Sequence, residues 1–586
     1  MRAMGVLLQT FYQRGTEGVP SPVDGAHFDP WWDHLAKQAQ SLQRVGFSAV
    51  WLPPVTKGAS GGFSIGYDVY DDYDLGSKNQ KGTRGTRYGT REELARCVAI
   101  MRANGLDVYI DLVENQRAGG SGPGGFTFRY VDADGKPGGG RFPKNPENFH
   151  PNVPEDPGTV PGQDFSFGSD LAPINSKPPG YVFNGLIDSA DWMTRALDVQ
   201  GYRLDDAKGV STQFMLPMLN SKSMKGKFAV GEFFDGNLGL IQNWLFNGMQ
   251  GRASAFDFPT RFMLQRMCNR SGPFSMASLD HAGLAGSNPF NAVTFVENHD
   301  TDSKPFEAII RNKALGYAYI LTSEGYPCVF YKDYSDDPGC YGGGKLDNTR
   351  TLKQVIENLI FIHEKIANGA TQQRFLDFDI IAYERLAGDH LLVALNSDEQ
   401  NNRTITVDTG FGANALLHDY SGHGADVRAD NNGRVTITAP PNHNGLGFVC
   451  YSHAGLGGGF AATAHAVTQA FDGAQDLDIR SADNNQLVEV GRVWCDHGAK
   501  ISGSLHFNTH DWSDQTNIVL QLLDPSKKPL VADKTYLRGT PQGEALAGET
   551  KTTGWHTFQI RSNATPATNV KPSYTLNVTY RASKTI

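Results

Sequence analysis

The sequence predicts an α/β protein: a (β/α)8 TIM barrel with an inserted irregular domain, followed by two C-terminal β-sandwich domains. Two observations predict the barrel. Short apolar runs at residues 108–113, 228–230 and 292–296 each end in a polar cluster, as buried parallel strands do. Helical spacing of apolar residues lies between such runs. A third observation, period-two alternation confined to the last part of the chain, predicts the sandwiches.

The barrel is predicted to begin over residues 1–113. Apolar residues recur at helical spacing over residues 31–45 and 91–104, which predicts two helices. The opening run, MRAMGVLLQTFYQ, enters a first barrel strand and has no basic, apolar and small-residue series of a signal peptide. We therefore expect a secreted protein whose signal peptide is absent from this chain, or a cytoplasmic protein.

An inserted domain is predicted over residues 114–180. This stretch is rich in Gly, Pro, Asn and Asp, with segments such as GGSGPGGF and NPENFHPNVPEDPG, and helical periodicity disappears. A structureless loop of this length is uncommon in a compact barrel. The barrel resumes over residues 181–375, beginning with a helix at 182–199 and closing after a helix at 352–367.

Two β domains are predicted after the barrel. Residues 379–396 alternate as strands around a turn at 387–389, and further strands at 403–407, 435–437 and 447–451 complete a β-sandwich over 376–453. AGLGGG, at 454–459, has the composition of a flexible linker. Residues 460–586 form a second β-rich domain.

Composition excludes several classes of protein. Hydrophobic residues make up 39% and charged residues 20% of the 586, which is typical of a globular chain with a large core. A formal net charge of −9 argues against nucleic acid and anionic membranes as partners, and no apolar run is long enough to span a membrane. The six cysteines show no metal-ligand spacing and leave disulfides open. We expect a monomer.

Three acidic residues follow three predicted strands. Asp205, Glu232 and Asp300 come after strands whose carboxyl ends meet at one rim of a barrel, which is where this fold carries its chemistry. Cleaving an acetal requires one protonated and one ionised carboxyl group. Arg203, two residues before Asp205, could keep Asp205 ionised as a nucleophile, so that Glu232 donates the proton. The alternative is a structural Arg203–Asp205 ion pair and a solvated Glu232.

Nine motifs follow one another along the chain: GFSAVWLPP (46–54), GYDVYDDYDLG (66–76), RYGTREEL (87–94), GLDVYIDLVEN (105–115), GYRLDDAK (201–208), GEFFDGNLGLIQNWL (231–245), SAFDFPTRF (254–262), TFVENHDT (294–301) and GYPCVFYKDY (325–334). Together they resemble the α-amylase family of glycoside hydrolases, in family order and over most of the first ~450 residues. The resemblance implies that Asp205 is the nucleophile, Glu232 the general acid/base and Asp300 the transition-state stabiliser. It implies substrate contacts from Tyr67, Arg203, Lys208, His299 and Gln116.

The resemblance also implies a bound calcium ion that clamps the insert to the barrel. The positions that match its ligands are Asn115, Asp164, Asp170 and the carbonyl of Gly209. Calcium prefers such oxygen ligands, and a Gly- and Pro-rich insert has little core of its own. The alternative is that Asp164 and Asp170 only cap turns.

Two positions depart from the family pattern. Gln116 and Gly209 stand where the family usually has histidines. Glutamine can hydrogen-bond a sugar hydroxyl but cannot carry a positive charge, and Gly209 keeps only its carbonyl. Turnover or acceptor preference is therefore expected to differ from that of typical relatives.

Aromatic side chains are candidates for holding sugar rings. Near the motifs these are Tyr67, Phe233, Phe234 and Trp244, and in the last domain Trp494, Trp512 and Trp555. The last three would form either a starch-binding surface or part of a sandwich core.

The sequence favours a retaining, endo-acting hydrolase of α-1,4-glucosidic bonds in starch and maltooligosaccharides. A transglycosylase or isomerase of α-glucans on the same scaffold remains an alternative. Such an enzyme differs from a hydrolase in how its acceptor site excludes water, and the motifs do not show this difference. A non-catalytic glucan-binding protein is disfavoured by the three acids together.

Overall fold

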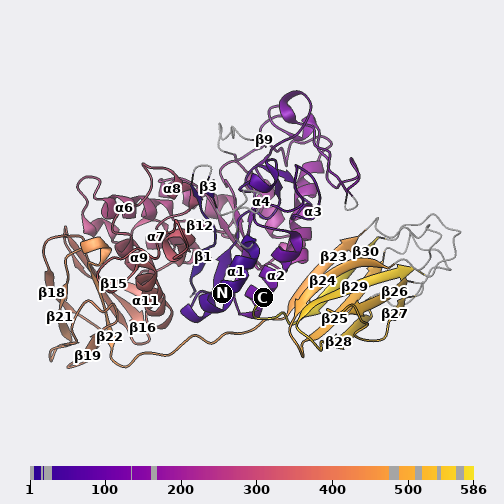
Figure 1. Cartoon of the computed structure of the whole chain (residues 1–586). Helices are drawn as coiled ribbons and strands as arrows, with labels where there is room; N and C mark the ends of the chain where they lie inside the picture. The colour runs from indigo at the N-terminus through magenta and orange to yellow at the C-terminus, as the bar shows by residue number, and fades with distance from the viewer. Residues whose placement is uncertain are drawn as a thin grey trace.

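Eight parallel strands close into a barrel, so the predicted fold is confirmed. The computed structural model describes residues 5–14, 17–18, 30–132, 135–159, 168–473, 487–507, 518–536, 543–562 and 573–586. Around the barrel the order is β1-β14-β13-β12-β11-β10-β7-β4, and the helices pack outside it (Figure 1). The strands are β1 (Leu7–Gln9), β4 (Ala49–Trp51), β7 (Asp107–Leu112), β10 (Gly201–Leu204), β11 (Phe228–Gly231), β12 (Ser254–Phe256), β13 (Ala292–Phe295) and β14 (Tyr326–Phe330).

The long helices lie where apolar periodicity predicts them. Four of them, α1 (Trp31–Val45), α2 (Arg91–Ala103), α3 (Tyr181–Leu197) and α11 (Leu352–Lys365), match predicted helices within two residues at each end. Thr90 and Glu93 form a capping box at the start of α2, which satisfies backbone N–H groups of the first turn. The shorter α-helices include α4 (Thr212–Leu219), α5 (Leu238–Gln242), α6 (Phe258–Asn269), α7 (Gly283–Ser287), α8 (His299–Ser303), α9 (Lys313–Thr322) and α10 (Tyr331–Tyr334).

The insert between β7 and α3 has little regular structure. In the described part of the insert, strand pairing is limited to β8 (Gln116–Arg117) with β9 (Ser169–Asp170) and isolated bridges. A buried ion cluster ties it to the barrel: Asp72 accepts from Lys144 Nζ at 2.6 Å and from Arg117 Nε at 3.0 Å. Burial opposes ionisation of Asp72, but these two cations outweigh it and hold the pKa of Asp72 well below its ordinary value.

The first sandwich begins earlier than expected. Its first strand, β15 (Asn368–Leu376), lies, except for its last residue, within the range assigned to the barrel and pairs with β16 (Ile380–Ala387). β15 is a polar edge strand, NGATQQRFL, with few apolar residues to reveal it. The predicted turn at 387–389 does separate β16 from β17 (Leu391–Asn396). The sheets are β15-β16-β17-β22-β19-β20 and β18-β21, with β18 (Arg403–Asp408), β19 (Leu416–Asp419), β20 (Val427–Arg428), β21 (Arg434–Ala439) and β22 (Phe448–His453).

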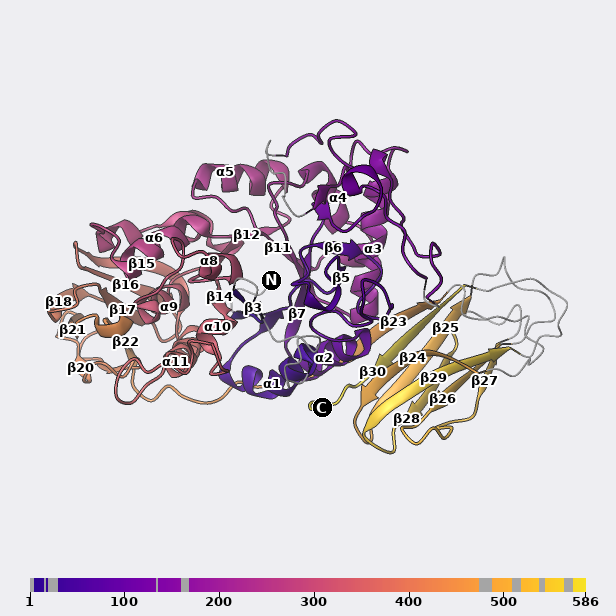
Figure 2. The same cartoon turned by 45° about the horizontal axis from the view of Figure 1, so that its top comes forward.

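The last domain is a sandwich of two four-stranded sheets on the other side of the barrel (Figures 1 and 2). Its sheets run β23-β30-β25-β28 and β24-β29-β26-β27. The strands are β23 (Val467–Gly473), β24 (Val488–Cys495), β25 (Lys500–Phe507), β26 (Ile518–Leu523), β27 (Lys534–Tyr536), β28 (Ala545–Glu549), β29 (Gly554–Ser562) and β30 (Tyr574–Tyr580).

This domain docks on α2. Ala99 and Ala103 of α2 belong to its hydrophobic core. Arg96 of α2 lies 5.1 Å from the ring centres of both Trp494 and Trp555, which pack edge to face at 5.4 Å. Both rings therefore take part in a cation–π contact between domains.

The linker between the sandwiches is anchored, contrary to its composition. It runs past the barrel as an extended segment (Figure 1). Lys365 Nζ donates to the Gly459 carbonyl at 2.9 Å, and Gln43 Nε2 donates to the Phe460 carbonyl at 3.0 Å.

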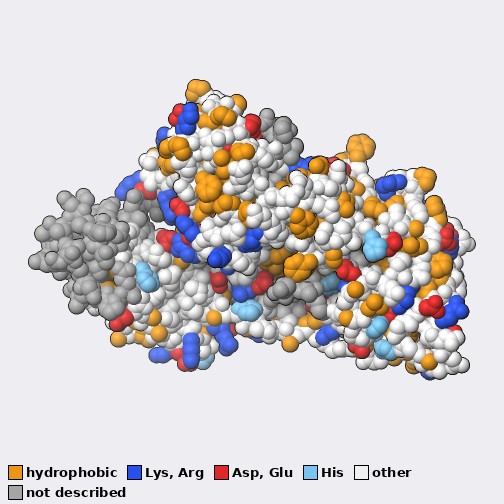
Figure 3. Space-filling model, turned by 180° about the vertical axis from the view of Figure 1, so that it is seen from behind, with side chains coloured by type: hydrophobic (Ala, Val, Ile, Leu, Met, Phe, Trp, Pro, Cys, Tyr) orange, Lys and Arg blue, Asp and Glu red, His pale blue; other side chains and the backbone are white. Residues whose placement is uncertain are grey.

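The structure also shows the state of the cysteines, the distribution of charge on one face and the character of the helices. All six cysteines are free. On the face drawn in Figure 3, acidic and basic side chains are interspersed. None of the helices in the described residues is long and apolar enough to cross a membrane.

The ion cluster under the insert predicts a large effect of Asp72→Ala. This change removes the carboxylate that Lys144 and Arg117 share, and leaves Arg117 only its longer contact with a carboxylate, that of Glu114 at 3.6 Å. Breaking a buried ion pair typically costs about 3–5 kcal/mol, so we expect the free energy of unfolding in urea to fall by about that amount. Glu92→Ala is the control, since Glu92 pairs with an exposed Arg84 at 3.1 Å, and such a pair contributes ~0–1 kcal/mol. Equal losses in the two variants would contradict the role given to Asp72.

Candidate active site

The three acids lie at one rim of the barrel. Asp205 directly follows β10 and Glu232 directly follows β11, and these strands are hydrogen-bonded neighbours. Asp300 lies in α8, in the segment that follows β13. The carboxyl ends of parallel strands share one rim, so the fold brings together three residues that are far apart in sequence.

Arg203 links the carboxylates. Its side chain is 1% exposed, and it contacts Asp205 through Nη1 and Glu232 through Nη2, the latter at 2.6 Å. Nη1 also donates to Asp111 Oδ1 at 2.8 Å. The predicted contact with Asp205 is present, but Glu232 is buried beside the same guanidinium, so the alternative of a solvated Glu232 is wrong.

A layer of residues beneath the acids holds Arg203 in place. Asp111, inside β7, accepts from Tyr67 Oη at 2.8 Å and from Trp51 Nε1 at 3.2 Å. The guanidinium carbon of Arg203 lies 5.2 Å from the Trp51 ring centre and 5.6 Å from that of Tyr67. Asp111 therefore fixes an arginine and a tyrosine at once, which makes it a positioning residue.

His299 connects Asp300 with the layer that contains Tyr67. Its ring stacks on Tyr67 with centres 5.2 Å apart and planes 6° apart. Gln9 Nε2 contacts Nδ1 at 2.9 Å, and Nε2 lies 3.4 Å from Asp300 Oδ2. Burial and the Arg203 charge lower the pKa of His299 well below its ordinary value. The imidazole is therefore neutral, and with Gln9 as donor its hydrogen is on Nε2, toward Asp300.

Burial raises the pKa of the acids to different levels. The pKa of Asp205 rises to about 6 and that of Glu232 to about 7, against the opposing effect of Arg203. Repulsion by Asp300 and a hydrogen bond donated by Glu232 to Asp300 add to the rise at Glu232. Glu232 is thus the better proton carrier and Asp205 the more readily ionised group.

Gln116 and Lys208 flank the acids. The Gln116 side chain is fully buried, donates to the Tyr67 carbonyl at 3.0 Å and hydrogen-bonds Asp205. Lys208 Nζ pairs with Asp235 at 2.7 Å. Gln116 therefore contacts one of the three acids directly, whereas Lys208 pairs with a different carboxylate, that of Asp235.

The nearby aromatic candidates are used mainly for packing. Phe233 and Trp244 are buried and lie 6.0 Å apart between ring centres, and Phe234 packs on Phe258 at 4.3 Å. Tyr67 is also buried but belongs to the layer that contains His299 and Arg203.

Three of the four predicted calcium positions converge; the fourth, Asp164, lies outside the described residues. Asn115 Nδ2 donates to Asp170 Oδ1 at 2.9 Å, while Asn115 Oδ1 faces Gly209. A Cβ at Gly209 would overlap both Asn115 Oδ1 and Asp206 Oδ2, so the absent side chain leaves room between these oxygens. Within the described part of the chain, no three His, Cys, Asp or Glu side chains form a metal cluster.

Asp206 is a residue that the sequence prediction missed. Its Oδ2 is buried without a hydrogen-bond partner, and its backbone is left-handed with φ +34°. Burial and the charges of Asp205, Glu232 and Asp170 raise the pKa of Asp206 to about 8. Two adjacent acids in LDDAK were the available signal, as an acid inside the apolar run VYIDLV was for Asp111.

Several known proteins are similar to this chain. Residues 391–452 match the family model "Alpha-amylase C-terminal". The chain is 29% identical over 476 residues to glucan 1,4-alpha-maltohexaosidase of Bacillus sp. (strain 707), covering 73% of this chain and 88% of that protein. It is 30% identical over 420 residues to alpha-amylase of Bacillus licheniformis, covering 62% and 78%. The solved structure of gamma-CGTase from alkalophilic Bacillus clarkii superposes with a TM-score of 0.57 at 16% identity, covering 98% and 95%.

The raised pKa of Glu232 predicts that Glu232→Gln stabilises the fold at pH 8. The pKa of Glu232 is higher in the folded chain than its ordinary 4.5, so stability is lost as pH rises from about 4.5 through 7. An amide avoids this loss. We therefore expect the free energy of unfolding of Glu232→Gln to exceed that of the unmodified chain by on the order of 1 kcal/mol at pH 8, and by less toward pH 5. Calorimetry at both pH values measures it, with Glu92→Gln on the surface as control. A gain that is larger at pH 5 would contradict the assignment.

Proposed function

Because this chain belongs to the α-amylase family of glycoside hydrolases, we propose that it is a retaining, endo-acting hydrolase of α-1,4-glucosidic bonds in starch and maltooligosaccharides. The observation that carries the proposal is that one guanidinium, that of Arg203, binds both Asp205 and Glu232. Carboxyl groups on one guanidinium are close together. Retaining glycosidases keep this pair ~5–5.5 Å apart, whereas inverting enzymes leave room for a water molecule.

Each acid has a role that suits its surroundings. Asp205 ionises first and is the nucleophile that attacks the anomeric carbon. Glu232 protonates the leaving oxygen, because its higher pKa keeps a proton available near neutral pH. Once the leaving sugar departs, Glu232 takes a proton from the water that releases the covalent intermediate.

Asp300 and His299 act together on the sugar. Asp300 hydrogen-bonds Glu232 and faces His299 Nε2 at 3.4 Å. Its negative charge stabilises the oxocarbenium-like transition state. The neutral His299 donates a hydrogen bond without adding a positive charge that would oppose that state.

A glucan transglycosylase is the second candidate. The likeness in fold to a gamma-CGTase along nearly the whole chain favours it. The two reactions share the covalent intermediate and differ in whether water or a sugar hydroxyl accepts the glycosyl group.

Product analysis separates the two candidates. Incubation with maltoheptaose, followed by chromatography, is expected to yield only shorter oligosaccharides, at internal cleavage points. Products longer than maltoheptaose, or cyclic products, would establish transfer and overturn the hydrolase proposal.

The roles of the acids predict large losses of activity. Glu232→Gln removes the proton donor and Asp205→Asn the nucleophile, with little change in shape. General acid catalysis alone contributes about 10² to 10⁴ in rate, so we expect kcat on starch to fall at least that far in each variant. Asp336→Asn, an exposed acid, is the control. Near-normal kcat in either active-site variant would refute its role.

We also propose that calcium binds beside Gly209, because the residues there fit a hard cation. An unpartnered carboxylate oxygen of Asp206 and the amide oxygen of Asn115 converge where a Cβ would otherwise be, and oxygen ligands of this kind suit calcium. Asp170 and the Gly209 carbonyl complete the described set. Bound there, calcium supplies charge compensation and links the insert to the catalytic turn.

Removal of calcium is therefore expected to destabilise the insert. At a hundredfold excess over Kd, a ligand of the folded state contributes about 2.7 kcal/mol, so a chelator should lower the thermal midpoint and calcium should restore it. Asp206→Ala and Asp170→Ala should each reduce bound metal, measured by elemental analysis and Tb³⁺ luminescence. Asp336→Ala is the control. Metal content unchanged in Asp206→Ala would remove Asp206 from the site.

A further inference from the structure

Lys57 is a fully buried lysine at the carboxyl-end rim of the barrel. It begins β5 (Lys57–Gly58), which follows the barrel strand β4 and pairs with β6 (Val69–Asp71). The turn between β5 and β6 carries Tyr67. The carboxylate nearest to the Lys57 ammonium group is that of Asp74, with Nζ and Oδ2 3.7 Å apart, and neither side chain is exposed.

The ammonium group of Lys57 lies in a cage of backbone carbonyls. Nζ donates to the carbonyls of Thr83, Arg84 and Gly85 at 2.9, 2.7 and 3.0 Å, and it contacts the Lys78 carbonyl at 3.4 Å. Three short contacts with acceptors require three N–H donors, which lysine has only in its protonated form. The cage therefore holds a positive charge, as the carbonyl rings of potassium channels hold a potassium ion.

Asp74 folds the segment that forms the cage. Its Oδ1 accepts from the backbone N–H groups of residues 76, 77 and 78 at 2.8–3.1 Å, and its carbonyl accepts from the Lys57 backbone N–H at 2.7 Å. Carbonyl oxygens gathered around one point repel one another unless a cation lies between them. The shape of residues 78–85 therefore depends on the charge of Lys57.

The same segment supports the turn that carries Tyr67. Just beyond the cage, Tyr88 Oη donates to the Ile65 carbonyl at 2.7 Å. Tyr67 lies two residues after Ile65, and in the candidate active site it stacks on His299 and donates to Asp111. A continuous series of contacts therefore runs from the cage to the residues around the acids.

We propose that Lys57 is a positioning residue of the active site, whose ammonium group acts as a built-in cation that shapes residues 74–88 and thereby holds Tyr67 in place. A metal ion at such a point could exchange with solvent, whereas the lysine is covalently attached to the segment that it organises. The effect on activity rests on the proposed function, and the effect on the shape of the segment does not.

The test replaces Lys57 with Ala and supplies the missing part of the side chain as free propylammonium. The full chain is refolded from urea with propylammonium, or with 1-propanol, which has the same carbon chain and no charge. Hydrogen exchange of residues 59–68 and 78–85 reports the shape of the segment, and kcat/KM on maltoheptaose reports activity. Lys222→Ala, in a half-exposed ion pair with Asp188 outside this segment, is the matched control for both additives.

In Lys57→Ala we expect hydrogen exchange in both segments to become faster by about tenfold or more, because the carbonyls lose their charged donor. We expect kcat/KM to fall by about ten- to hundredfold, since a misplacement of ~1 Å at an active site can cost about 10²-fold in rate. Propylammonium should reverse most of both changes, and 1-propanol should reverse neither.

A second variant breaks the series of contacts beyond the cage. Tyr88→Phe removes the hydrogen bond to the Ile65 carbonyl and leaves Lys57 unchanged, so exchange should become faster at residues 59–68 but not at 78–85. We expect kcat/KM to fall by about three- to tenfold, with no effect of propylammonium. This variant tests the proposal even if Lys57→Ala does not refold.

Recovery of both readouts of Lys57→Ala by propylammonium alone supports the proposal. Normal kcat/KM in Lys57→Ala or in Tyr88→Phe, or equal recovery with 1-propanol, overturns the positioning role and leaves the proposed function standing. If the unmodified chain does not cleave maltoheptaose, the proposed function fails. Unchanged exchange at residues 59–68 in Lys57→Ala then overturns the cage as well, and faster exchange that propylammonium reverses upholds it.

Discussion

The active rim depends on one buried cation. Asp111, Asp205, Glu232 and Asp300 lie within a single water-poor space, where like charges repel strongly. Arg203 contacts the first three of these carboxylates, and without it their burial would be prohibitive. Because its guanidinium is planar and permanently charged, it also sets the carboxylates in fixed directions. Burial still outweighs its effect, which is why the pKa values of Asp205 and Glu232 stay raised and separated.

The insert is also held by buried charges, beside apolar side chains such as Phe128, Tyr130 and Phe149 that join the hydrophobic core. Asp72, Arg117 and Lys144 form its buried link to the barrel, and Asn115, Asp170 and Asp206 lie together where it meets the catalytic turn. The turn that contains Asp206 connects the proposed cation site with the proton donor, since the Asp206 backbone N–H donates to Glu232 Oε2 at 3.2 Å. A change at the proposed cation site would therefore reach the proton donor through one residue.

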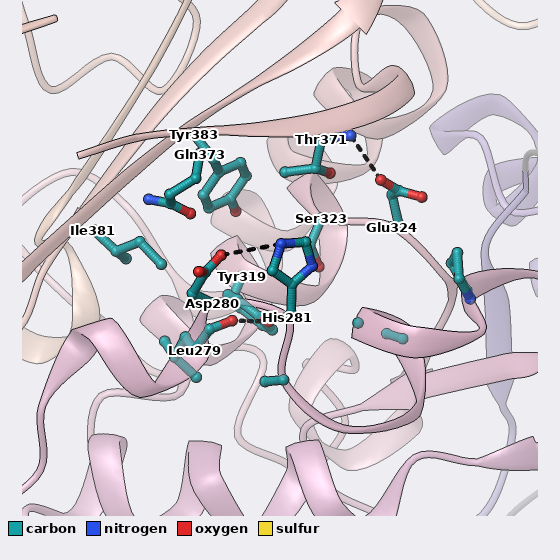
Figure 4. Close-up of a pocket in the computed structure, with 14 residues that line it drawn as sticks. Leu279, Asp280, His281, Tyr319, Ser323, Glu324, Thr371, Gln373, Ile381 and Tyr383 are labelled. Carbon is teal, nitrogen blue, oxygen red and sulfur yellow. Dashed lines mark hydrogen bonds and ion pairs between the residues drawn. The ribbon is translucent and has the colours of Figure 1, made fainter. Parts of the chain in front are cut away.

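The two β domains have different relations to the barrel. The last domain docks on α2 through Ala99, Ala103 and the Arg96–tryptophan contact. Trp494 and Trp555 are thus used for attachment, and Trp512 lies outside the described residues. The first sandwich instead packs on the barrel through apolar side chains, such as Ile381, Tyr383 and Val393, that belong to the same hydrophobic core as the barrel. Ile381 and Tyr383 also line a cavity of about 260 Å³ at this junction (Figure 4).

The sequence by itself determined the barrel, its main helices and the positions of the three acids after strands. Apolar periodicity and strand-end motifs are local patterns, so they can be read directly from the sequence. It did not reveal β15, whose polar edge pattern carries no burial signal, and it placed the start of the sandwich too late. Only the tertiary structure decided that Arg203 also binds Glu232, that Asp111 and Asp206 join the site, and that two tryptophans attach a domain. These are contacts between segments far apart in the chain, and burial and charge coupling arise only when the fold brings such segments together.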